Sequence, residues 1–101
     1  MHLIQLLLPL HDNGKQKFPP EYFDSVRNDL INRFGGVTAF LRSPAVGLWK
    51  TDDDVSRDDV VMFEVMSADL DEQCWLEYRA KLEKKFQQEE LLVGASQVKK
   101  L

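Results

Sequence analysis

This sequence has little cysteine, no long apolar run and no surplus of basic residues. Its single cysteine, Cys74, excludes an internal disulfide and suits a reducing compartment. Thirteen Lys and Arg residues against 17 Asp and Glu residues give a net charge of −4. Nucleic acid is therefore not expected as a partner, because phosphate binding needs a concentrated basic face. No stretch approaches the roughly 20 apolar residues of a membrane span, so no membrane partner is expected either.

The apolar segment near the start, Leu3 to Leu10, has a signal-peptide-like composition but lacks the other features of one. No basic region precedes it, and Pro9 and His11 stand where small residues would mark a cleavage site. We predict a β-strand over His2 to Pro9. With the lone cysteine, this favours a cytoplasmic protein of bacterial type. We expect residues 1–101 to form a single domain.

Two segments have the apolar spacing of amphipathic helices. The first is predicted to begin at Pro19-Pro20 and to end at Gly35-Gly36, which supplies a left-handed C-cap. Its apolar stripe consists of Tyr22, Phe23, Val26, Leu30, Ile31 and Phe34. The second is predicted to open with a capping box of Asp69 and Glu72. Its stripe consists of Trp75, Tyr78, Leu82 and Phe86.

Three further strands are predicted, over Val37 to Lys50, Val60 to Met66 and Leu91 to Val93. Pro44 should make the first of these an edge strand that bends or bulges, since proline cannot donate to a ladder. Gly94 is expected at a bulge or at the end of the last strand. Turn residues predict a turn over 11–15, where Asn13-Gly14 favours positive φ, and an exposed loop over 51–59.

The order strand, helix, strand, strand, helix, strand is that of an α+β, ferredoxin-like βαββαβ fold. In that fold a four-stranded antiparallel sheet carries both helices on one face. Strands one and three are central, which agrees with their apolar composition. The two predicted edge strands contain Pro44 and Gly94.

The segment Val60 to Met66 is apolar on both of its faces. Alternation puts Val61, Phe63 and Val65 on one face, and Val60, Met62, Glu64 and Met66 on the other. An uncovered apolar sheet face exceeds what a monomer usually exposes. We therefore expect a homodimer that packs sheet against sheet, so that one isologous contact covers both copies.

Gln5 and Glu64 are the polar exceptions in the two central strands, and both are expected on the face without helices. A buried carboxylate must pair, hydrogen-bond or become protonated. Arg42 is a candidate partner, and Arg79 is another if Glu64 lies near a sheet edge. Gln5 and Glu64 with such a partner form either a small-ligand site in apolar surroundings or a structural pair, which is buried in the protein or in the dimer interface.

Other candidate chemistries are weaker in this sequence. Trp49 either walls a pocket mouth or packs in a core or interface. Cys74 has no basic neighbour beside it in the sequence, so a nucleophilic role is not expected. The acidic segment over 52–59 lacks the glycine and the closing glutamate of a calcium loop. His2 and His11 lack metal-ligand spacing, so no metal site is expected.

Several segments together resemble a small bacterial family of uncharacterised domains with the dimeric ferredoxin-like α/β-barrel fold. They are Phe34 to Thr38, Gly47-Leu48-Trp49, Val60 to Val65 with its glutamate, and Trp75 through Arg79 to Phe86. The resemblance implies this fold, and it carries over no catalytic residue. The wider superfamily includes antibiotic-biosynthesis monooxygenases, muconolactone isomerases and haem-degrading enzymes.

Three functions compete at this point. The first is a homodimer that binds a small molecule near the sheet face, as a binding protein or as an enzyme without a cofactor. Its ligand-binding candidates are Gln5, Arg42, Trp49 and Glu64, with Glu64 the catalytic candidate. The second is a non-catalytic domain whose apolar face only dimerises or interacts. The third is haem binding or degradation, with His2 or His11 as the axial ligand.

Overall fold

A computed structural model describes the backbone of residues 1–42 and 60–101 and the side chains of residues 1–39 and 60–101. It contains the six predicted elements in the predicted order. The strands and helices are β1 (His2–Pro9), α1 (Pro20–Phe34), β2 (Thr38–Arg42), β3 (Val60–Ser67), α2 (Glu72–Lys85) and β4 (Leu92–Gln97). Pro44 and the predicted loop over 51–59 lie outside the described residues.

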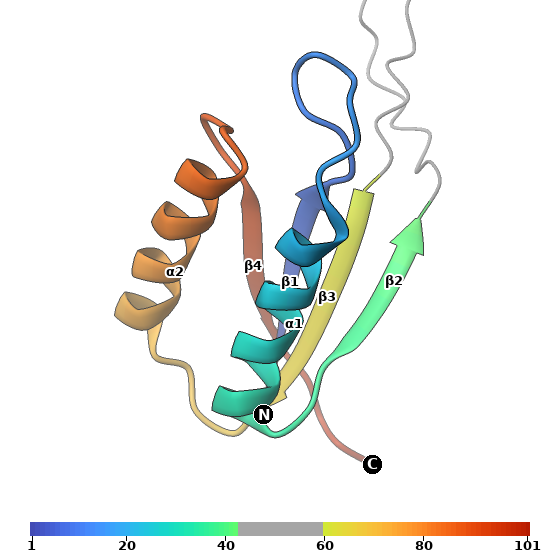
Figure 1. Ribbon diagram of the computed structural model, residues 1–101. Helices are drawn as coiled ribbons and strands as arrows, with labels where there is room; N and C mark the ends of the chain where they lie inside the picture. The colour runs from blue at the N-terminus through green and yellow to red at the C-terminus, as the bar shows by residue number, and fades with distance from the viewer. Residues whose placement is uncertain (43–59) are drawn as a thin grey trace, which may run out of the picture.

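The four strands form one antiparallel sheet in the order β2-β3-β1-β4 (Figure 1). β1 and β3 are therefore central, as their composition predicts, and β2 and β4 are the edges. Both helices lie on the same side of the sheet and run antiparallel to each other. The fold is α+β and ferredoxin-like, which confirms the prediction.

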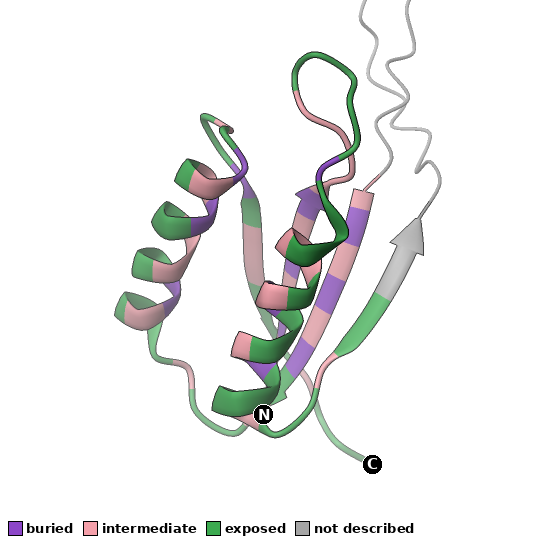
Figure 2. Ribbon diagram, in the orientation of Figure 1, coloured by how far each residue is buried: buried purple, intermediate pink, exposed green. Residues whose placement is uncertain are grey.

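Burial along the two central strands alternates with the strand period (Figure 2). The side chains that face the helices are buried, and their neighbours on the opposite face are partly buried or, at Met66, exposed. The buried set from the two strands is Ile4, Leu6, Leu8, Val61, Phe63 and Val65. The predicted alternation along Val60 to Met66 is thus confirmed, and the buried set identifies the face that the helices cover.

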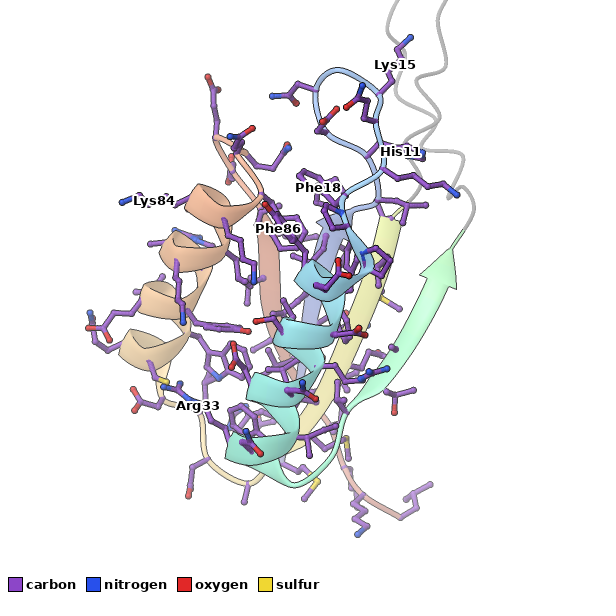
Figure 3. The ribbon with its side chains drawn as sticks, viewed as in Figure 1. His11, Lys15, Phe18, Arg33, Lys84 and Phe86 are labelled. Carbon is purple, nitrogen blue, oxygen red and sulfur yellow. The ribbon has the colours of Figure 1, made fainter. Side chains whose placement is uncertain are left out.

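Aromatic side chains close the core at the end where α1 begins and α2 ends. Phe86 is fully buried, and its ring centroid lies 4.9 Å from that of Phe18 and 5.6 Å from that of Tyr22 (Figure 3). Offset and edge-on contacts of this kind add to the stabilisation that burial alone provides. This cluster fixes the position of α1 relative to α2.

The ends of α1 follow the predicted signals. Pro19 occupies the N-cap and Pro20 the first turn, where the missing N–H costs nothing. Gly35 adopts the left-handed C-cap with φ of 76°, and its N–H donates to the Ile31 carbonyl. The predicted stripe is wrong at one position, because Ile31 is exposed.

The N-cap of α2 is Asp71 and not Asp69, so the predicted capping box is wrong. The Asp71 carboxylate accepts from the Cys74 N–H at 3.1 Å. Asp69 belongs to the preceding turn, where its carbonyl accepts from the Ser67 hydroxyl at 2.6 Å. The turn after β3 is therefore two residues longer than the capping pattern indicates.

Two further local predictions are corrected. In the turn after β1 the residue with positive φ is Lys15, at 64°, and not Asn13 or Gly14. The Asp12 carboxylate accepts from the Gln16 N–H and organises this turn. At the other edge, β4 runs through Gly94 to Gln97, because it stays paired with β1 along nearly its whole length.

Candidate functional site

The sheet face opposite the helices, called here the helix-free face, carries one polar row across its middle. The register aligns Thr38 with Glu64, Glu64 with Gln5, and Gln5 with Gly94, one residue from each strand. Residues aligned in this way point to the same face. The predicted meeting of Gln5 and Glu64 on this face is confirmed.

Gln5 and Glu64 are joined by a short side-chain hydrogen bond. Gln5 Nε2 donates to Glu64 Oε2 at 2.7 Å and lies 3.8 Å from Met62 Sδ. The amide nitrogen must face the carboxylate, so the orientation of the Gln5 amide is fixed. Among the residues that the structure describes, no donor bonds to Gln5 Oε1 or Glu64 Oε1 on this partly exposed face.

Open space borders this pair on the β4 side. Gly94 has no side chain, and a Cβ placed on it would meet no atom within 4 Å. On β1 and β3 apolar side chains flank the polar row, with Leu3 and Met66 on one side and Leu7 and Met62 on the other. On β4 the flanking residues are Ser96 and Leu92. Met66 is 46% exposed and Leu92 is 62% exposed, so these apolar side chains on the helix-free face are open to solvent.

The other residues that the sequence predicts near this pair are Arg79, Arg42 and Trp49. Arg79 lies on α2, on the opposite side of the sheet from Glu64, and its Nε is 3.9 Å from Glu83 Oε2. Arg79 as a partner of Glu64 is therefore wrong. Arg42 aligns with Val60 in the register, but its side chain lies outside the described residues, as does all of Trp49.

A second polar cluster, not predicted from the sequence, lies between the two helices. Asp29 of α1 contacts Tyr78 of α2, and Arg33, four residues further along α1, contacts Cys74, four residues earlier on α2. This pattern follows from the antiparallel direction of the two helices. The Tyr78 hydroxyl donates to Asp29 Oδ2 at 3.1 Å. These residues line a groove of about 370 Å³, together with Asn32, Glu77 and Lys81.

Burial raises the pKa of the Tyr78 phenol well above its ordinary value, because the phenolate would be poorly solvated. The negative charge of Asp29 and the hydrogen bond to it raise this pKa further, and the positive charge of Arg33 lowers it in part. The phenol is therefore held protonated and serves as a hydrogen-bond donor in the groove.

Arg33 reaches from the end of α1 toward the start of α2 (Figure 3). Its Nη1 donates to Cys74 Sγ, so the structure supplies the basic neighbour of Cys74 that the sequence order does not show. The spacing of Asp29 and Arg33, four residues apart on one helix, is visible in the sequence. Their partners on α2 depend on how the two helices pack, which the spacing does not reveal.

Within the described ranges, His, Cys, Asp and Glu side chains form no group of three that could hold a metal ion. His2 lies at the first position of β1, and His11 forms an isolated bridge with Lys17 beyond its other end. No helix in the described part of the chain is long and apolar enough to cross a membrane.

The fold is therefore of the ferredoxin-like class, and its helix-free sheet face carries the hydrogen-bonded pair of Gln5 and Glu64. Searches of protein-family models, of curated proteins and of solved structures found no match to this chain.

Proposed function

We propose that this protein is a homodimer of the dimeric α/β-barrel type, formed through the helix-free face, which binds a small molecule at Gln5 and Glu64. The single observation that carries the proposal is the 2.7 Å hydrogen bond between these side chains in the middle of an apolar face. A fixed polar pair in apolar surroundings is the usual composition of a small-ligand site.

The second copy is the proposed cover because the face is self-complementary. The polar row crosses β1 and β3 near their midpoints, with apolar residues before and after it. A two-fold axis along this row would set the row of one copy over that of the other, and the apolar residues of β1 and β3 over those of the second copy. The open space at Gly94 would then remain beside Gln5 as a recess.

The available atoms indicate the class of ligand. Gln5 Oε1 and Glu64 Oε1 are both acceptors, so they suit a ligand with neighbouring N–H or O–H donors. Leu7 and Met62 beside them suit an apolar body. Catechols and aromatic amidines have both features. Should the protein be an enzyme, Glu64 is the group placed to exchange a proton with such a donor.

A thermal-shift screen with catechol, benzamidine and benzoate tests the proposal, because a ligand that binds only the folded state raises the melting temperature. Catechol or benzamidine should raise it, whereas benzoate should not, since its carboxylate would face Glu64. Glu64→Gln should fold and dimerise normally and lose the shift. Glu90→Gln, at an exposed position outside the helices and strands, is the control.

A Glu64→Gln variant that is destabilised by on the order of 3 kcal/mol but still binds when folded would contradict the site. That result would favour the second candidate, a domain that only dimerises. The uncovered side chains of Met66 and Leu92 support this alternative, since they need a partner whether or not a ligand binds.

A further inference from the structure

We propose that the groove between α1 and α2 binds a small zwitterion with well-separated charges, such as a dipeptide, its carboxylate on Arg33 and its ammonium on Asp29. This site lies on the helix side of the sheet and is independent of the site at Gln5 and Glu64.

The first support is that the groove holds charges of both signs that do not pair with each other. Asp29 and Glu77 are acidic, and Arg33 and Lys81 are basic. Within the described residues the ion pairs are Arg27 with Asp24 and Arg79 with Glu83, and neither pair lies in the groove. The four groove charges sum to zero, so the groove favours neither a simple anion nor a simple cation.

The second support is that α2 holds the two α1 charges apart. Asp29 and Arg33 are four residues apart, a spacing at which opposite charges on a helix commonly pair. Here the Tyr78 hydroxyl donates a hydrogen bond to Asp29 Oδ2, and Arg33 Nη1 donates one to Cys74 Sγ. The two charges are thus fixed in place without neutralising each other.

Both groups keep hydrogen-bonding capacity for a ligand. A guanidinium has five N–H donors, and the thiol, a weak acceptor, uses only one of them. The remaining donors of Arg33 can take a carboxylate in a bidentate manner. Asp29 Oδ1 is not used by Tyr78 and can accept from an ammonium group.

The spacing and size of the groove set the kind of zwitterion. Side chains four residues apart on a helix have Cβ atoms about 5–6 Å apart, and the charged groups of Asp29 and Arg33 lie further out along their side chains. A dipeptide, whose ammonium and carboxylate are separated by a peptide unit, is long enough to contact both groups at once. The groove volume of about 370 Å³ lies within the range of small-ligand sites.

Three probes that differ only at their ends test the proposal: glycylglycine, its N-acetyl derivative without the ammonium, and its amide without the carboxylate. Each is titrated into the ¹⁵N-labelled full chain while amide chemical shifts are recorded. Glycylglycine should give saturable shifts confined to residues 29–33 and 74–81. Each blocked probe should bind about tenfold more weakly or worse.

Arg33→Gln should weaken glycylglycine binding by about tenfold or more. Arg27→Gln is the matched control on the same helix, because Arg27 is exposed and pairs with Asp24 outside the groove; it should leave binding unchanged. Equal affinity for the three probes, shifts outside the groove, or no saturable shift would each overturn the proposal. None of these outcomes depends on Glu64 or on dimer formation, so the proposed function stands or fails separately.

Discussion

At the scale of single residues, two carboxylates hold fixed partners on opposite sides of the sheet. Glu64 accepts from the Gln5 amide on the helix-free face, and Asp29 accepts from the Tyr78 hydroxyl between the helices. In each case the bond fixes a polar group that is partly removed from water, where an unmade bond would be costly. Within the described part of the chain, the second oxygen of each carboxylate accepts no hydrogen bond.

The raised pKa of Tyr78 predicts a loss of stability at alkaline pH. The folded protein binds the phenol proton more tightly than the unfolded chain does. The resulting stabilisation is complete below a pH of about 10, the ordinary tyrosine pKa, and is lost as the pH rises from there toward the raised value. Chemical denaturation across this range should show the loss, and Tyr78→Phe should reduce it.

Phenolate absorbance in a Tyr22→Phe background measures the titration of Tyr78 alone, because the chain has two tyrosines. Asp29→Asn should lower the pKa of Tyr78, but not fully to the ordinary value, since burial is the largest cause of its rise. If Tyr78 titrates at the ordinary tyrosine pKa in the folded Tyr22→Phe protein with Asp29 intact, that result would contradict the groove geometry.

The sequence could reveal one of these two carboxylate sites and not the other. Gln5 and Glu64 could be placed on one face because strand alternation and the fold order together define which strands are neighbours. Asp29 and Tyr78 are 49 residues apart on two helices. Their contact depends on the rotation and sliding of one helix against the other, and apolar spacing alone does not determine either.

At the scale of the secondary-structure elements, the corrected N-cap of α2 gives a direct prediction. Asp71→Ala should lower the free energy of unfolding by about 1 kcal/mol, because it removes the acceptor for the Cys74 N–H. Asp69→Ala should change it by less than about 0.5 kcal/mol, since only the backbone carbonyl of Asp69 is used. Urea denaturation measures the free energy of unfolding of both variants. A larger decrease for Asp69→Ala than for Asp71→Ala would show that Asp69 is the N-cap after all.

Element types were predictable, whereas several element ends were not. Pro20 and Gly35 mark the ends of α1 because each has a backbone property that few residues share. Asp69 and Asp71 are chemically the same, so the sequence cannot say which of them caps α2. The extent of β4 beyond Gly94 is set by its pairing with β1, which is a tertiary effect.

At the scale of the whole molecule, the two sides of the sheet differ in how they are covered. α1 and α2 bury the central strands on one face, whereas the other face keeps Met66 and Leu92 exposed beside the polar row. Two-sided apolar character of β1 and β3 is readable from the sequence. What covers the helix-free face depends on the assembly, which the sequence of one chain does not reveal. We propose that a second copy of the chain covers it.

Sedimentation equilibrium of three matched chains tests this central claim most directly. The wild-type chain should sediment with twice the chain mass of 11.7 kDa. Leu92→Lys puts a charge on the helix-free face and should give the monomer mass, whereas Leu76→Lys adds the same charge at an exposed position on α2 and should leave the dimer intact. Circular dichroism should show both variants folded, because both leucines are at least half exposed. A monomeric wild-type chain, or a dimer that survives Leu92→Lys but not Leu76→Lys, would contradict the account.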